Sequence, residues 1–194
     1  MVIRMLETKE YEAKVKDSLR EYFEKLKEKV EVENQWVPFR GEAVSKYSPR
    51  VDVAVGPFAY GTEQYEEKYD KLTRVSRDFL NNLLLSFKKN SKNFSFESEI
   101  ITDCRGLDSV NPNARCFMAV EIEKSGTRKH RLGDIVNACS LGRIGIVVPW
   151  DQSTLNSFLK ITEYLSFLKG KLKPTYETRN LVIVSKEQFL KCLC

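Results

Sequence analysis

Residues 116–123 read CFMAVEIE, an apolar run that ends in two glutamates, Glu121 and Glu123. Side chains two positions apart in a β-strand point to the same face, so the two carboxylates are expected to project together. Neighbouring carboxylates repel each other, and burying either is costly unless a positive charge lies between them. The run therefore predicts a strand that ends at a cation site, and Mg²⁺ is a hard ion that takes oxygen ligands.

The composition is typical of one globular domain. The 194 residues are 42% apolar and 30% charged, with 9 glycines and 6 prolines, so extensive disorder is not expected. No apolar run approaches the roughly 20 residues of a membrane span, and the N-terminal MVIRMLETKEYE becomes charged too early for a secretory signal. These features predict a cytoplasmic protein with no membrane partner.

The cysteine and charge content further limit the classes of protein to which the chain could belong. Five cysteines without a CxxC pair, together with a single histidine, do not support a disulfide framework or a zinc site. A net charge of +5 suits a polyanionic partner, although this feature alone is weak.

The hydrophobic pattern predicts an α/β domain with a mixed central sheet flanked by helices. The first half holds an amphipathic helix at 8–30 and two short strands within 35–58, the second of them VDVAV at 51–55. Residues 58–115 read as an insertion with a long helix at 64–88 and a strand FSFESEIITDC at 94–104. After the strand at 116–123 we expect a helix at 127–141, a strand RIGIVVP, a helix capped by Asp151, a strand NLVIVS and a short terminal helix. All 194 residues are taken as one domain.

A third carboxylate, Asp52, lies on the face of its strand opposite the valines. The order helix, strand, strand with SPRVD (48–52), strand with VEIE (120–123), helix, strand resembles the PD-(D/E)XK nuclease superfamily, which includes restriction endonucleases and junction resolvases. The family's second motif is usually Glu-x-Lys. Asp52 and Glu121 match its metal ligands, while Glu123 occupies the lysine position in a Glu-x-Glu variant that some restriction endonucleases carry.

The resemblance implies a restriction-endonuclease-like fold and hydrolysis of DNA phosphodiester bonds with Mg²⁺ or Mn²⁺ held by Asp52, Glu121 and Glu123. The family's first helix commonly lends a glutamate to the active site. Glu12 is the glutamate that falls within the apolar arc of the predicted first helix. The alternatives are a solvated helix-flank position for Glu12 and a solvent-edge position for the three strand carboxylates.

The missing lysine is expected from the helix after Glu123, whose buried face is marked by Leu132, Ile135, Val136 and Cys139. Lys129 falls beside this face in the first turn, so we assign it a catalytic role, against the alternative of an ordinary solvated side chain. Arg128, Lys129 and Arg131 are candidate nucleic-acid contacts.

Further basic residues, Lys88, Lys89 and Lys92, end the predicted long helix. The apolar stretch FLNNLLLSF (79–87) of that helix suggests a homodimer interface within 58–115. Two other functions stay open: a junction-resolving or repair nuclease, and a catalytically inactive nucleic-acid-binding or assembly module.

Overall fold

The computed structural model describes residues 2–40, 46, 48–108 and 110–193, with side chains described from Glu7 onward. Its helices and strands follow in the order α1 (Val2–Lys25), β1 (Val32–Trp36), β2 (Val51–Val55), α2 (Glu66–Val75), α3 (Arg77–Asn90), the short 3₁₀ helices η2 (Glu97–Glu99) and η3 (Cys104–Leu107), β3 (Cys116–Glu123), α4 (Arg128–Leu141), β4 (Gly142–Pro149), α5 (Gln152–Gly170), β5 (Leu181–Ile183) and α6 (Lys186–Cys192). None of the helices in these ranges combines the length and apolar character that crossing a membrane requires.

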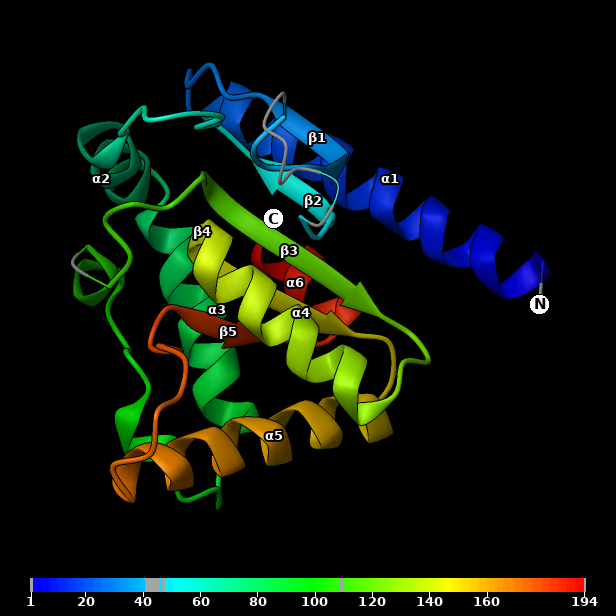
Figure 1. Ribbon diagram of the computed structural model, residues 1–194. Coiled ribbons are helices and arrows are strands. Elements are labelled where there is room, and N and C mark those ends of the chain that lie inside the picture. Colours follow the sequence, from blue (N-terminus) through cyan, green and yellow to red (C-terminus); the bar gives the residue numbers. More distant parts are fainter. Residues whose placement is uncertain (1, 41–45, 47, 109, 194) are drawn as a thin grey trace.

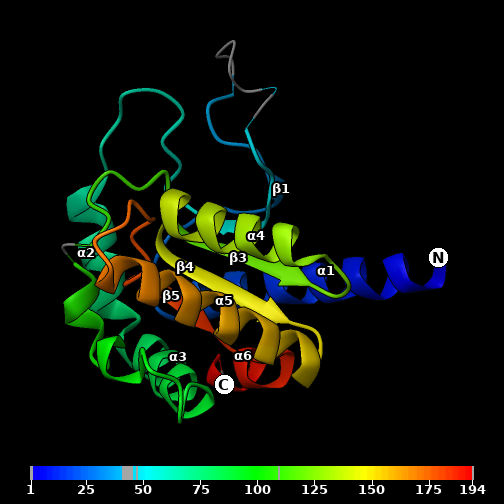
Figure 2. The same cartoon turned by 60° about the horizontal axis from the view of Figure 1, so that its bottom comes forward.

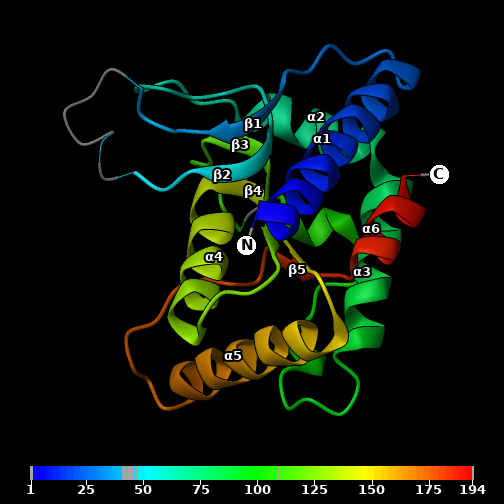
Figure 3. The same cartoon turned by 90° about the vertical axis from the view of Figure 1, so that its right-hand side faces the viewer.

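The five strands form one mixed sheet in sequence order, β1-β2-β3-β4-β5. β1, β2 and β3 pair antiparallel, whereas β3, β4 and β5 pair parallel. Helices α4 and α5 cover one face, and α1, α3 and α6 cover the other (Figures 1 and 3). The prediction of an α/β domain with a mixed sheet is confirmed, and β2 and β3 are interior strands of that sheet.

The sheet is apolar on both faces because helices bury it from both sides. Every residue of β4 is buried, as is every residue of β3 except the terminal Glu123. Phe117 of β3 packs against Phe23 of α1 and Tyr69 of α2, with ring centroids 6.1 and 6.3 Å away. The N-terminal helix and the segment between β2 and β3 therefore share the main core.

The predicted long helix at 64–88 is wrong in one respect, because two helices stand there, separated at Ser76. The Ser76 hydroxyl donates to the carbonyl of Leu72 at 2.6 Å, and a serine that bonds its own preceding turn competes with regular helix geometry. The apolar residues of α3 lie in the core of the single chain: Phe79, Leu80, Leu83, Leu84 and Phe87. Their burial within one chain accounts for most of the apolar stretch 79–87, whereas Leu85 is 55% exposed. The homodimer interface stays a prediction.

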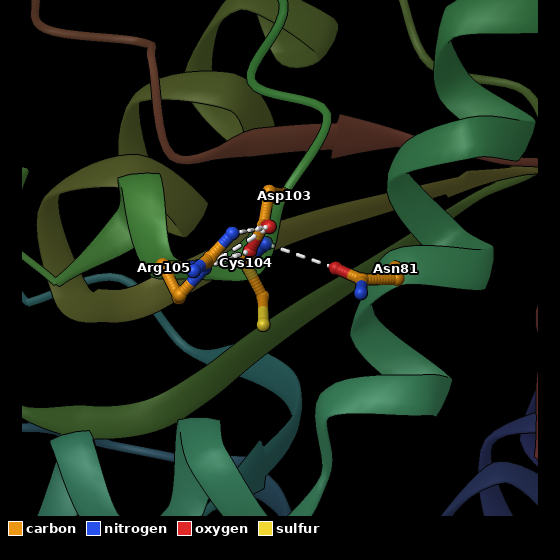
Figure 4. Close-up of polar contacts among 4 residues, drawn as sticks. All are labelled: Asn81, Asp103, Cys104 and Arg105. Carbon is orange, nitrogen blue, oxygen red and sulfur yellow. Dashed lines mark hydrogen bonds and ion pairs between the residues drawn. The ribbon is translucent and has the colours of Figure 1, made fainter.

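The predicted strand at 94–104 is also wrong: η2 and the start of η3 occupy it. Phe94 and Phe96 lie in a turn and not in an extended chain. Their rings lie 5.8 Å apart, and the amide of Glu97 donates to the carbonyl of Phe94 in a tight turn. The amide of Cys104 then donates to the side-chain oxygen of Asn81 at 2.9 Å, which ties this connection to α3, while Asp103 caps η3 (Figure 4).

The second half follows the prediction closely. Thr127, Asp151 and Ser185 cap α4, α5 and α6 through their side chains. Because β3 and β4 are parallel and each leads into a helix, the first turns of α4 and α5 follow the same edge of the sheet, at which β3 ends with Glu123 (Figure 2).

Candidate functional site

Asp52 and Glu121 face each other across the central pair of antiparallel strands. β2 and β3 pair Val53 with Val120 and Ala54 with Ala119, and one step further in this register Asp52 stands opposite Glu121. Asp52 Oδ2 accepts a hydrogen bond from the amide of Ile122 at 2.7 Å. The Glu121 carboxyl accepts one from the amide of Asp52. Each carboxylate is thus held by the backbone of the neighbouring strand.

Glu121 is the most buried acid of this group, with 4% of its surface exposed. Asn137 of α4 bonds its carboxyl, yet Oε1 has no hydrogen-bond partner among the described residues. Burial first, and then the charges of Asp52 and Asp134, raise the pKa of Glu121 well above its ordinary value. A buried carboxylate oxygen without a donor is a position that a cation could fill.

Glu123 lies at the end of β3, where the chain turns toward α4. Its Oε1 accepts hydrogen bonds from the amides of Ser125, at 2.6 Å, and Gly126. A Cβ on Gly126 would stand 2.2 Å from Glu123 Oε2, so only glycine allows this approach. The turn SGT after the strand therefore fixes the second glutamate of the Glu-x-Glu pair.

Asp134 of α4 completes the group from the helix side, and its carboxyl bonds that of Glu123. Burial is the largest cause that raises the pKa of Asp134 to about 7, followed by the charges of Glu123 and Asp52. The Asp134 carboxyl therefore titrates near neutral pH.

Glu12 reaches the same group from α1, on the opposite face of the sheet. The amide nitrogen of Gln35 lies 3.3 Å from Glu12 Oε2 and 3.0 Å from Asp52 Oδ1, so one side chain links the two acids. Gln35 has a φ of 52°, a left-handed conformation at the end of β1. Burial, followed by the charge of Asp52, raises the pKa of Glu12, and burial is also the main cause of the raised pKa of Asp52.

The structure thus brings together four of the five predicted catalytic residues, namely Glu12, Asp52, Glu121 and Glu123. These four residues and Asp134 are called the carboxylate cluster below. Its members are spread along the sheet edge. Among the described residues, no three His, Cys, Asp or Glu side chains are gathered closely enough to hold one ion between them.

The basic side chains that were predicted for the site do not all lie beside the carboxylate cluster. Lys129 and Arg128 are exposed on the first turn of α4 and line a groove between α4 and α5. No polar contact joins Lys129 to the cluster in the described part of the chain. Arg131 is closer, because its charge opposes the rise in the pKa of Asp134. Lys124 turns to the other side, where it pairs with Glu7 and lies 4.6 Å from the Trp150 ring centre.

Gln35, Asp134 and Asn137 were not predicted from the sequence. Asp134 and Asn137 are three residues apart and therefore share one side of α4. Polar side chains at this spacing, in the helix that follows the Glu-x-Glu strand, are the signal that could have found them. Gln35 gives no such signal, because its role depends on its left-handed backbone.

Comparisons of the chain with protein-family models, with curated proteins and with solved structures returned no match.

Proposed function

We propose that the protein is a Mg²⁺- or Mn²⁺-dependent endonuclease that hydrolyses phosphodiester bonds in DNA, similar to restriction endonucleases. The observation that carries the proposal is the pairing of Asp52 with Glu121, two backbone-held carboxylates. Burial raises the pKa of both, and the charge of Asp52 raises that of Glu121 further. The order α1, β1, β2 with Asp52, β3 with Glu121, α4, β4 is also the order on which the resemblance to PD-(D/E)XK nucleases rests.

The chemistry of the cluster fits a hard divalent cation. Its ligand atoms are carboxylate oxygens, and Glu121 Oε1 is buried without a donor. Asp52 and Glu121, with Glu123 beside them, would hold the ion. Mg²⁺ usually needs only one or two carboxylates, because waters and substrate phosphates complete its shell, so a compact set of three acids is not required.

A cation bound there would polarise the phosphate and lower the pKa of a bound water. The protein's own residues position the reactants. The amides of Ile122 and Asp52 fix the two ligands, the turn through Gly126 fixes Glu123, and Gln35 holds Glu12 beside Asp52. On the opposite side of the cluster, Arg131 supplies positive charge near Asp134 and takes the place expected of Lys129.

Plasmid nicking tests the proposal. We expect supercoiled plasmid to be relaxed or linearised with Mg²⁺ or Mn²⁺ and left intact with EDTA. Asp52→Asn and Glu121→Gln keep the side-chain shapes and remove the charges, so each should abolish cleavage. Glu10→Gln is the matched control, because Glu10 is exposed on α1 and outside the cluster.

The products separate the alternative functions. A fixed pattern of cuts in duplex DNA supports a restriction-type enzyme, whereas cleavage confined to branched or damaged DNA identifies a resolving or repair nuclease. Binding of DNA without cleavage of any duplex, single strand or junction would overturn the enzyme proposal in favour of a binding or assembly module.

A further inference from the structure

A basic groove of about 830 Å³ runs between α4 and α5. Four cationic side chains line it, Arg128, Lys129 and Arg131 from α4 and Lys160 from α5. None of the described residues that line it is acidic. We refer to it as the α4–α5 groove. Like charges gathered along one groove repel each other and favour an anionic occupant.

The groove is connected to the carboxylate cluster through Arg131. One guanidinium nitrogen of Arg131 donates to Ser157 of α5 at 2.7 Å, on the groove side. On the cluster side, the charge of the same residue opposes the rise in the pKa of Asp134. Arg131 Nε is buried without a hydrogen-bond partner in the described part of the chain. α4 therefore separates the two features by the width of one helix.

Tyr164 adds an aromatic surface to this basic lining. It is 57% exposed, and one turn further along α5 Phe167 is equally exposed. The other apolar residues of α5 are buried or partly buried. Exposed rings of this size can stack with the faces of planar ligands. In a DNA duplex the base faces are covered by their neighbours, so an aromatic ring on a protein surface can stack only on the bases of a single strand.

We propose that the α4–α5 groove binds a single-stranded DNA segment, with phosphates on Lys129 and Lys160 and a base stacked on Tyr164. As a description of the substrate, this inference rests on the proposed nuclease function, because it places an unpaired strand beside the site of cleavage. The binding itself does not require catalysis, so it can be measured separately.

Fluorescence anisotropy of labelled oligonucleotides tests the inference with the full chain in EDTA, where no cleavage occurs. We compare a single strand with a duplex of the same sequence. The single strand has about 16 nucleotides, which is the longest site that one single-strand-binding domain usually covers. We expect the single strand to bind more tightly. Tyr164→Ala should weaken single-strand binding about fivefold or more and leave duplex binding unchanged, since stacking of one base has this effect. Tyr164→Phe should retain the affinity.

The salt dependence tests the cationic side chains. Each phosphate contact contributes about 0.7 to the slope of log K against log salt concentration for a single strand. The Lys129→Ala, Lys160→Ala double variant should therefore reduce this slope by about 1.4. The matched controls are the Lys14→Ala, Lys25→Ala double variant, at two exposed positions of α1, and Tyr176→Ala, whose ring is 53% exposed outside the groove.

Equal affinities for single strand and duplex, or an equal effect of Tyr164→Ala on both, would overturn the inference. So would a loss of binding in the controls as large as in the groove variants. The outcome is independent of the nuclease proposal, which is tested by Asp52→Asn in the plasmid assay. A groove that binds single strands in a protein without nuclease activity supports the inference while refuting the proposed enzyme function.

Discussion

The stability of the cation-free protein is expected to fall as pH rises, because Asp134 has a folded-state pKa of about 7 against an ordinary value of 3.8. Between these two values the folded chain holds more protons than the unfolded chain, so stability decreases with rising pH. Below its ordinary pKa, Asp134 does not change the free energy of unfolding. Above about pH 7, the ionised carboxyl lowers the free energy of unfolding by the full amount. Asp134→Asn removes the titrating group and keeps a donor toward Glu123.

The raised pKa sets the size of the effect. A change from 3.8 to about 7 is slightly more than three pH units, which at 1.36 kcal/mol per unit corresponds to roughly 4 kcal/mol. Relaxation and solvent screening reduce this to about 2–4 kcal/mol. At 2–4 °C per kcal/mol for a chain of this size, Asp134→Asn should raise the melting temperature by about 5–15 °C at about pH 8.

Thermal denaturation followed by circular dichroism, in EDTA across the range from about pH 4 to 8, measures this difference. We expect the two proteins to converge at the acidic end, and Glu10→Gln to follow the unmodified protein throughout. Mg²⁺ or Mn²⁺ should stabilise the unmodified protein more at high pH than at low pH, because the cation and the proton compete for the carboxylates. A flat wild-type profile, or an Asn variant less stable at every pH, would refute the reasoning.

Three further predictions concern single residues. Gly126→Ala should lower the cleavage rate at least tenfold with little change in DNA affinity, because its Cβ would displace the Glu123 carboxylate; unchanged cleavage kinetics would contradict this. Glu12→Gln should reduce cleavage in the plasmid assay, whereas Glu10→Gln should not, and equal rates would remove Glu12 from the site. Phe117→Ala should reduce the free energy of unfolding by about 3–5 kcal/mol in urea titrations, since the ring is fully buried between two helices. A loss below about 1 kcal/mol would contradict that packing.

The sequence predicted the elements that have a strong period or a clear cap. The apolar run 116–123, the helical pattern at 127–141, the cap at Asp151 and the alternation in VDVAV all mark elements of the structure. The elements of the segment 58–115 were harder to predict, because its sequence resembles a strand and a continuous helix that the structure does not contain. The stretch FSFESEIITDC reads as a strand, but Phe94 and Phe96 lie in a turn with their rings tilted against each other. Ser76 interrupts a helical pattern that is continuous in the sequence.

In the site, the strand carboxylates and Glu12 of α1 were predictable, whereas Asp134 and Asn137 of α4 were not. The buried side of α4 is formed by Ile135, Ala138, Cys139 and Leu141, so the helix is rotated by roughly a quarter of a turn from the face expected from Leu132 and Val136. This rotation brings Asp134 to the cluster and leaves Lys129 in the groove. Side-chain size alone misled the prediction, because Ala138 is small but buried and Leu132 is large but half-exposed.

The link between Glu12 and Asp52 has an electrostatic consequence. An amide has two hydrogens and no charge, so Gln35 can join two carboxylates without neutralising either of them. A lysine in its place would hold them equally well and cancel one negative charge. The amide instead leaves the full negative potential at the sheet edge to attract a cation from solution. The distance between α1 and β2 then depends neither on an ion pair that salt could screen nor on the ion that the site would bind.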